Sequence, residues 1–359
     1  MRIGILTFHD ADNFGCVFQC FGLQEAVKKL NSEAEVEIIN FKRVRPGADD
    51  ESKPVDEEVS VRASKFKAFR DEYMNISKED YASLEDLPVD RYDLCIVGSD
   101  QVWNYNLVFG REKAYFLQFA GAKTRKISYA ASIGSVYDDP NKMEWLRAQL
   151  CGMDAISLRE RSVFDGVQAL TDKHVNICID PSLLHDRTFW EKYEKKPEKL
   201  GSEKYVLMYA LGYGWCRDNE RKAAEMASKV AVSKGINVIH YYYGKLREWL
   251  PDGSEHCFCE GPQELLWLFH HAEYVICCSF HGTAFSLIYE RPFYTFHTPG
   301  NGSRMKDLVE YLGLPDRYID EDLPEENWNW DIPWGDVENR LLHFRGESLD
   351  YLSKEIELI

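Results

Sequence analysis

The sequence has no apolar run that approaches the roughly 18 residues needed to cross a bilayer. Its first residues, MRIGILTFHDADNFG, are apolar for only a few positions before they meet His9, Asp10 and Asp12. This pattern predicts a first strand and not a signal peptide. No transmembrane segment is expected, and the expected location is the cytoplasm.

Positive charge is also scarce. Lys and Arg together number 43 against 60 Asp and Glu, so the formal net charge is −17, and no dense run of Lys or Arg occurs. Such a surface repels nucleic acid and anionic lipid, so we expect neither as a partner. An anionic small substrate would require arginine or lysine side chains gathered at one place.

The ten cysteines lack the C-x-x-C spacing of zinc sites. Cys95 and Cys178 lie inside apolar strand patterns, and the pairs in CFC (257–259) and CC (277–278) fit no metal framework. We therefore expect buried, reduced thiols and no metal, which again favours the cytoplasm. The loop at 8–19 is not a G-x-G-x-x-G fingerprint, so a dinucleotide is not indicated.

The length of 359 residues suits two domains of ordinary size. Strand-like runs alternate with helical stretches, the clearest helix lying at 16–31, and this alternation favours parallel sheets covered on both faces. The predicted strands are 2–8, 34–41, 92–98, 126–132, 155–159 and 175–181, and then 205–211, 236–243, 274–280 and 292–296. A charged segment at 45–58 predicts a surface loop.

The sequence thus predicts an α/β fold of two Rossmann-like domains that face a cleft, with ligands at the carboxyl ends of the strands. The chain turns polar and rich in Lys and Glu before the second series of strands begins. The expected parts are an N-terminal domain at 1–185, a connection at 186–204, a C-terminal domain at 205–335, and a helix at 336–359 that returns to the first domain.

Polar residues gather where a central strand ends. The run at 92–98 leads directly into Ser99, Asp100 and Gln101, and Asn104 follows. Because an open α/β sheet places its ligand contacts at such ends, these residues are candidate ligand contacts. The alternative is a plain strand-to-helix turn in which Ser99 or Asp100 caps the helix.

Two other predicted strands end in the same way. After the first strand, Asn13 and Gly15 open a helix that carries Gln19, and the N-terminus of a helix can hold an anion. In the second half, His281 stands at a polar turn before another helix. A purely structural role is the alternative to catalysis for that histidine.

Five motifs in fixed order carry a family resemblance: NFGCVFQCFGLQ (13–24), IVGSDQVWN (96–104), SLRE (157–160), DPSLL (180–184) and CSFHGTAFSLIYERPF (278–293). Together they resemble the polysaccharide pyruvyl transferase family over nearly the whole chain. The resemblance implies a GT-B-type fold and transfer of a pyruvyl group from phosphoenolpyruvate to sugar hydroxyls of a polysaccharide or its precursor. A pyruvate ketal forms and phosphate is released. Phosphoenolpyruvate is then a co-substrate, with no bound cofactor, and a lipid-linked acceptor would bring the enzyme to the inner face of the membrane.

The resemblance also implies roles for individual residues. His281 matches the family's histidine and is the candidate acid or phosphate ligand, and Asp100 is the candidate base or acceptor-orienting group. Arg159 matches an arginine that the family uses for the anionic donor. The other expected substrate-binding residues are Asn13, Gly15, Gln19, Ser99, Gln101, Asn104, Ser279, Gly282 and Thr283.

One position departs from the family pattern. Some members carry arginine two residues before the histidine, where this chain has Ser279. Arg304, in GNGSRMKDL (300–308), is a candidate replacement, and the favoured alternative is that Arg304 is a helix-start residue on the surface. In that case the donor need not be ordinary phosphoenolpyruvate.

Two other functions stay open. A nucleotide-sugar-dependent glycosyltransferase of the same GT-B architecture would need an acidic ribose ligand, for which Glu264 is the only candidate. A non-catalytic sugar-binding or scaffolding protein is the other alternative, because the many aromatic residues of the chain would suit stacking on sugars. The aromatic cluster WNWDIPW (328–334) is expected to pack a C-terminal segment across the domains.

Overall fold

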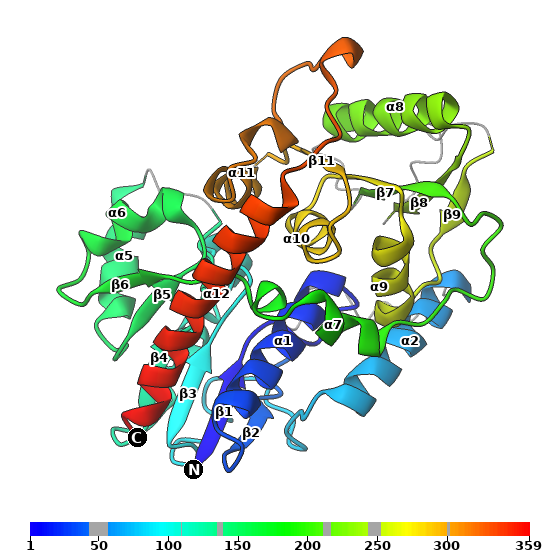
Figure 1. Cartoon of the computed structure of the whole chain (residues 1–359). Coiled ribbons are helices and arrows are strands. Elements are labelled where there is room, and N and C mark those ends of the chain that lie inside the picture. The colour runs from blue at the N-terminus through cyan, green and yellow to red at the C-terminus, as the bar shows by residue number, and fades with distance from the viewer. Residues whose placement is uncertain (43–56, 109, 135–138, 211–216, 243–252, 300–301) are drawn as a thin grey trace. The chain divides into compact units, whose positions relative to one another are not determined.

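The computed structural model describes residues 1–42, 57–108, 110–134, 139–210, 217–242, 253–299 and 302–359 (Figure 1). The chain divides into two compact units. The first comprises Met1–Val55, Lys67–His185 and Leu342–Ile359, and the second comprises Asp56–Phe66 and Asp186–Leu341. Most of the loop predicted at 45–58 falls outside the described residues, and Glu57 already begins a helix.

The first unit is built on parallel strands. Its four-stranded sheet has the order β2-β1-β3-β4, and single bridges at Ala155 and Leu158 connect β4 to the parallel pair β5-β6. The strands are β1 (Arg2–Leu6), β2 (Glu35–Ile38), β3 (Leu94–Val97), β4 (Arg125–Ser128), β5 (Ile156–Leu158) and β6 (Val175–Ile177). All four residues of β3 are buried, as expected for a central strand of a parallel sheet.

The helices of the first unit begin with α1 (Phe14–Leu30), which is buried at every position from its start through Gln24. Lys28 and Lys29 lie in its last turn, where positive charge interacts favourably with the partial negative charge at the C-terminal end of the helix. The others are α3 (Tyr105–Val108), α4 (Glu112–Tyr115), α5 (Pro140–Leu150) and α6 (Phe164–Gln168). Helix α2 (Glu57–Tyr73) has residues in both units.

The second unit has its own parallel sheet of six strands in the order β12-β11-β10-β7-β8-β9. The strands are β7 (Tyr205–Ala210), β8 (Asn237–Tyr242), β9 (Glu255–Cys257), β10 (Tyr274–Cys277), β11 (Phe293–Phe296) and β12 (Tyr318–Ile319). The helices are α7 (Arg187–Trp190), α8 (Arg217–Lys234), α9 (Pro262–His271), α10 (Phe280–Ile288) and α11 (Gly302–Tyr311). Of these strands, β9 and β12 were not predicted, because β12 has only two residues and β9 reads EHC.

Two helices cover opposite faces of this sheet. Met208 belongs to the hydrophobic cluster under α8, whereas the adjacent Tyr209 lies against α10 at Gly282. Because successive side chains of a strand point to opposite faces, this alternation separates the two layers. Both faces of β7 are consequently buried, which explains its continuous apolar run.

The last helix, α12 (Trp334–Glu357), contributes its residues from Leu342 onward to the first unit. Glu355 forms an ion pair with Arg125, and the Tyr351 hydroxyl donates to the backbone oxygen of Ser128 at 2.9 Å. These contacts attach the end of the chain to β4.

The segment expected to connect the domains has structure of its own. Residues 186–204 were expected to be only a connection, but they include α7 and group with the second unit. Trp190 is fully buried there, with its ring 5.2 Å from that of Phe285. The cluster at 328–334 places Trp330 edge-on against Tyr294 of its own unit, and its packing across the domains stays a prediction. Among the described helices, none combines the length and apolar content needed to cross a membrane.

Candidate functional site

The carboxyl end of β3 lies very close to the backbone of the segment that follows β4. A Cβ atom at Gly98, where φ is +120°, would lie 2.2 Å from the backbone oxygen of Tyr129. Glycine therefore permits this approach. Ser99 follows, fully buried, and its hydroxyl donates to the backbone oxygen of Ala130 at 2.8 Å.

Gln19 holds Ser99 from the other side. Its Oε1 accepts the backbone N–H of Ser99 at 3.0 Å, and its Nε2 lies 3.0 Å from both the Thr7 hydroxyl and the backbone oxygen of Phe8. Gln19 has no exposed surface. In this structure it therefore positions the ends of β1 and β3, and its amide faces no solvent.

The N-terminus of α1 already has a cap. The Asn13 side-chain oxygen accepts the backbone N–H of Cys16 at 3.2 Å, and Gly15 is buried in the first turn. Asn13 thus has the structural role that its residue type favours at this position.

Asp100, Gln101 and Asn104 are polar and partly exposed, whereas Val102 and Trp103 between them are fully buried. Asp100 adopts a left-handed backbone conformation, with φ of 64°, and its Oδ1 accepts the backbone N–H of Gln101 at 2.8 Å. The thiol of Cys16 donates to Asp100 Oδ2 at 3.4 Å. The amide of Asn104 donates to the side-chain oxygen of Gln101 at 2.8 Å. This group presents carboxylate and amide atoms, which suit the hydroxyl groups of a ligand.

Arg159 and Asp180 form a buried ion pair beneath these residues. Arg159 Nη1 lies 2.6 Å from Asp180 Oδ2, and the two side chains are 3% and 0% exposed. The Ser99 hydroxyl lies 3.3 Å from the same carboxylate oxygen, while Asp180 Oδ1 accepts from the Ser182 hydroxyl at 2.7 Å. The pair therefore connects the chain segments that follow β3, β5 and β6.

Three carboxylates surround the guanidinium. Burial lowers the pKa of Arg159, but the charges of Asp180, Glu160 and Asp100 outweigh burial and raise it. The arginine therefore stays charged, and its charge is compensated within the first unit. Phosphoenolpyruvate at this guanidinium would meet carboxylates at short range, which disfavours binding of an anion.

Sequence reasoning missed Asp180 and Glu160 as members of this group. Glu160 is fully buried and accepts a hydrogen bond from the Ser132 hydroxyl. Both acidic residues lie inside the motifs SLRE and DPSLL, so the motifs themselves contain the signal.

In the second unit, three predicted residues build the start of α10. Ser279 is the N-cap residue, and its hydroxyl accepts the backbone N–H of Gly282 at 3.5 Å. A Cβ atom at Gly282 would lie 2.8 Å from Cys277 Cβ, so the helix packs closely on the sheet. The Thr283 hydroxyl, fully buried, lies 2.9 Å from that of Thr295. These contacts fix the first turn, which carries His281.

Arg304 lies in the first turn of α11 and is buried, with 8% of its surface exposed. The alternative of a surface position is therefore wrong. Helix α10 follows β10 and α11 follows β11, and these strands are parallel neighbours. His281 and Arg304 thus lie in the first turns of two helices that start from the same edge of one sheet.

The predicted residues therefore form two groups. Asp100, Arg159 and the residues around them belong to the first unit, whereas His281 and Arg304 belong to the second. Each group is built from elements of a single unit. That the two groups line one site stays a prediction.

Glu264, the candidate ribose ligand, is already engaged. It is 4% exposed, with one carboxylate oxygen 2.9 Å from Lys65 Nζ and the other accepting the backbone N–H of Gly261 at 3.1 Å. Its carboxylate thus caps α9 and pairs with a lysine.

One cluster has the residue types of a metal site. Glu194, His270 and His271 place ligand atoms within 4.8 Å of one another. However, Arg187 Nη2 lies 2.7 Å from His270 Nε2, and Glu194 lies 2.9 Å from His270 Nδ1. Because arginine can only donate, Nδ1 carries the ring proton and points it at Glu194. A cation would have to displace that proton beside a guanidinium, so the arrangement does not favour a metal.

Comparison with known proteins gives a fold and a family. No curated protein sequence matches the chain. Similar solved structures include a putative UDP-N-acetylglucosamine 2-epimerase from Listeria monocytogenes, with 11% identity, coverage of 98% of this chain and 91% of that one, and a TM-score of 0.54. The UDP co-structure of S. aureus MnaA has 11% identity, coverage of 96% and 90%, and a TM-score of 0.53. The UDP-GlcNAc 2-epimerase of Methanocaldococcus jannaschii has 12% identity, coverage of 95% and 92%, and a TM-score of 0.51.

At such identities these neighbours show the fold alone, which is α/β with two Rossmann-like domains of the GT-B type. The family comes from the sequence. The model of polysaccharide pyruvyl transferases matches residues 13–297, which include all five motifs of the resemblance. This protein therefore belongs to the polysaccharide pyruvyl transferase family.

Proposed function

We propose that this protein transfers a pyruvyl group from phosphoenolpyruvate to two hydroxyls of a saccharide, forming a cyclic pyruvate ketal and releasing phosphate. Family membership supports a transferase. The observation that carries the finer proposal is the placement of His281 and Arg304 in the first turns of α10 and α11, at one edge of the second sheet.

The donor belongs at this edge because phosphoenolpyruvate carries a phosphate and a carboxylate. A guanidinium can hold either group with two parallel hydrogen bonds, and the first turn of a helix favours negative charge. Arg159 of the first unit is a poorer donor ligand, since Asp180 already neutralises it. We therefore assign to Arg304 the donor-binding role that the family pattern gives to an arginine near the histidine.

The acceptor suits the first unit. Asp100, Gln101 and Asn104 are partly exposed and offer oxygen and amide atoms to sugar hydroxyls. Asp100 is fixed by its bond to the backbone N–H of Gln101, so its carboxylate can orient a hydroxyl or accept its proton.

The proposed chemistry balances without a cofactor. A proton is added to the methylene carbon of phosphoenolpyruvate while the first sugar hydroxyl adds to the neighbouring carbon and loses its proton. The bond from that carbon to the phosphate oxygen then breaks, and the second hydroxyl adds in place of the phosphate. The second hydroxyl proton leaves with the phosphate. His281 acts as the acid or holds the leaving phosphate, and Asp100 serves as the base.

The nucleotide-sugar alternative gains no support from the site. Its one candidate ribose ligand, Glu264, is engaged with Lys65 and Gly261. The solved structures that contain nucleotide sugars or UDP share only the fold with this chain.

The decisive experiment incubates the protein with phosphoenolpyruvate and a panel of saccharide acceptors. Phosphate release is followed together with the mass of the product, and parallel reactions contain UDP-sugars in place of phosphoenolpyruvate. We expect acceptor-dependent phosphate release and a ketal product, both reduced about 10²- to 10⁴-fold in His281→Gln. Release of UDP from a UDP-sugar, with no reaction of phosphoenolpyruvate, would replace this proposal with the glycosyltransferase.

A further inference from the structure

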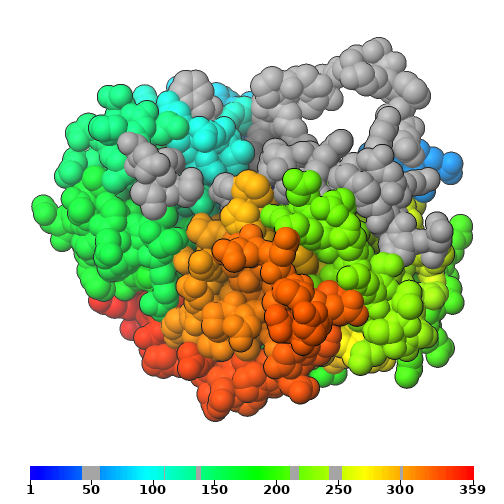
Figure 2. Space-filling view, turned by 90° about the horizontal axis from the view of Figure 1, so that it is seen from above, coloured from blue at the N-terminus to red at the C-terminus, as the bar shows by residue number. Residues whose placement is uncertain are grey.

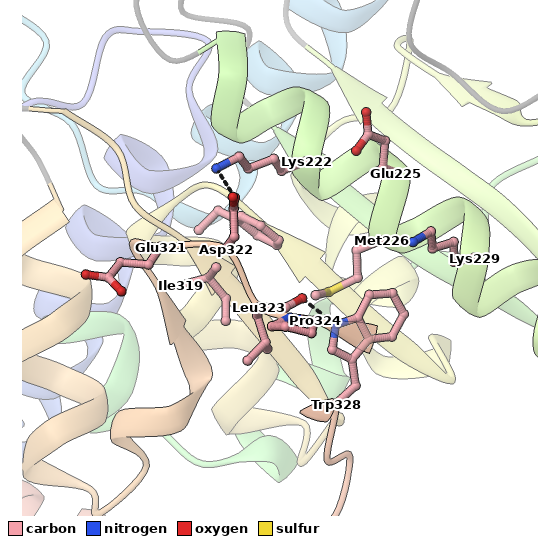
Figure 3. Close-up of a pocket in the computed structure, with 11 residues that line it drawn as sticks. Lys222, Glu225, Met226, Lys229, Ile319, Glu321, Asp322, Leu323, Pro324 and Trp328 are labelled. Atoms are coloured by element: carbon pink, nitrogen blue, oxygen red, sulfur yellow. Dashed lines mark hydrogen bonds and ion pairs between the residues drawn. The ribbon is translucent and has the colours of Figure 1, made fainter. Parts of the chain in front are cut away.

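The second unit has a pocket that contains none of the predicted site residues. It has a volume of about 240 Å³ and lies between α8 and the segment that follows β12 (Figure 3). Figure 2 shows these two segments side by side on the surface of this unit, in light green and orange. Since a water molecule occupies about 30 Å³ of liquid, the pocket has the volume of roughly eight waters and suits a ligand about the size of one sugar ring.

One wall of the pocket is the indole of Trp328. Its Nε1 donates to the backbone oxygen of Leu323 at 3.2 Å, so the only polar atom of the ring is satisfied and the ring plane is fixed. Met226 and Phe296 are buried and add further apolar surface to the lining. The pocket thus combines a rigid aromatic wall with an apolar floor, which is the usual composition of a small-molecule site.

The rim of the pocket carries charges of both signs. Lys222 lies 2.5 Å from Asp322, and Lys229 lies 5.9 Å from the centre of the Trp328 ring. The complete charged lining is Lys222, Lys229, Glu225, Glu321 and Asp322. Because the pair of Lys222 and Asp322 is exposed, it contributes only about 0–1 kcal/mol, and the hydroxyls of a ligand can compete with it.

This lining discriminates between ligand classes. The three carboxylates of the lining disfavour a phosphate-bearing ligand, and its two ammonium groups leave an excess of only one carboxylate to attract an organic cation. An uncharged polyol can donate its hydroxyl hydrogens to the carboxylates and accept from the ammonium groups at once. A sugar ring also has an apolar face of C–H groups, which matches the indole wall.

We propose that this pocket binds a neutral saccharide, with one ring face stacked on Trp328 and hydroxyls bonded to Lys222 and Asp322. The inference rests on the proposed function in one respect, because a polysaccharide acceptor would supply the sugar. The pocket would then hold units of that acceptor other than the one that reacts.

The test is binding of neutral disaccharides, measured by ligand-observed NMR without phosphoenolpyruvate. Maltose, lactose and N,N′-diacetylchitobiose are the probes, and inorganic phosphate and choline are the charged controls. We expect at least one disaccharide to bind, and Trp328→Ala to weaken its binding about tenfold or more. Trp328→Phe, which retains an aromatic face, should lose less.

The matched control is Trp267→Ala. Trp267 is also partly exposed, lies on α9 of the same unit, and stacks on His271 outside the pocket. Thermal unfolding checks that each variant is folded. No binding of any disaccharide, equal loss in Trp267→Ala and Trp328→Ala, or tighter binding of phosphate or choline would each overturn the proposal.

Failure of the proposed function has a different signature. In that case saccharide binding would still depend on Trp328, while phosphoenolpyruvate would release no phosphate with any acceptor.

Discussion

Arg159 and Asp180, 21 residues apart in the chain, form an ion pair of 2.6 Å whose side chains are almost completely inaccessible. The same carboxylate lies 3.3 Å from the Ser99 hydroxyl. One acidic side chain thereby fixes two residues that the family pattern places at the substrate. The motifs SLRE and DPSLL and the serine at the end of β3 are thus linked physically, because Arg159 and Ser99 both contact Asp180.

Asp180→Asn should destabilise the first unit strongly. Removing Asp180 leaves the buried guanidinium without its ion-pair partner, which costs up to about 3–5 kcal/mol and less where the charges of Glu160 and Asp100 compensate. The free energy of unfolding in urea measures the effect. As a control, Glu144→Gln removes the partner of Arg147 from an exposed pair and should cost at most about 1 kcal/mol. Equal losses in the two variants would contradict the importance of burial for the Arg159 pair.

Arg304→Ala should weaken binding of phosphoenolpyruvate far more than binding of the acceptor. Loss of a buried charged partner costs roughly 2–5 kcal/mol, which is about 30-fold to several thousand-fold in affinity. Arg304→Lys should be intermediate, since lysine keeps the charge but lacks the planar fork. Titration calorimetry with phosphoenolpyruvate measures both. Lys306→Ala is the control, because Lys306 lies on the same helix with 48% of its side chain exposed. Unchanged donor affinity in Arg304→Ala would remove Arg304 from the donor site.

Ser279→Arg is not expected to restore donor binding to Arg304→Ala. Ser279 is the N-cap of α10 and only 6% exposed. Ser279→Arg would remove the cap, at a cost of about 0.5–2 kcal/mol, and force a long side chain into a packed position. Thermal unfolding of the single variant should show this loss, and restored donor binding in the double variant would refute it.

Gly98→Ala should prevent the end of β3 from forming as it does here. The added Cβ would overlap the backbone oxygen of Tyr129, and φ of +120° disfavours any side chain, so we expect a loss of about 3 kcal/mol or more. The matched control is Gly166→Ala in α6, where a Cβ meets no atom within 4 Å. Alanine there should be neutral or stabilise by up to about 1 kcal/mol. Similar unfolding curves for the two variants would contradict the close approach at Gly98.

His240 should make the stability of the second unit sensitive to acid. Burial, with a smaller contribution from His256, lowers the pKa of His240 from 6.5 to about 3. Below about pH 6.5 the histidine is therefore protonated in the unfolded chain but stays neutral in the folded protein. The free energy of unfolding then falls by up to about 1.4 kcal/mol per pH unit until about pH 3. His240→Gln should show a shallower decline between pH 7 and 5 in urea unfolding. His343→Gln, at a position 70% exposed, should leave the slope unchanged. An unchanged slope in His240→Gln would contradict a neutral buried histidine.

Much of the fold was predictable because it depends on local patterns. The apolar run at 94–97 and the helix opened by Asn13 follow from residue periodicity and capping, which neighbouring residues decide. Strands β9 and β12 were missed because β12 has only two residues and β9 reads EHC, whereas the equally short β5 and β6 lie inside longer apolar runs. The start of α2 was missed because this polar helix has no clear apolar stripe. The motifs around Ser99, Arg159 and His281 were also visible in the sequence, and the family match agrees with them.

The sequence by itself determined the alternation of strands and helices, the polar strand ends and the family. Only the tertiary structure decided which of the charged residues are already paired with another charge and which are buried. It neutralises Arg159 with Asp180, engages Glu264 with Lys65, and buries Arg304 at the start of α11. The physical reason is that the strength of a charge depends on burial and on the counter-charges within a few ångströms. Those neighbours come from distant parts of the chain, so no local pattern contains them.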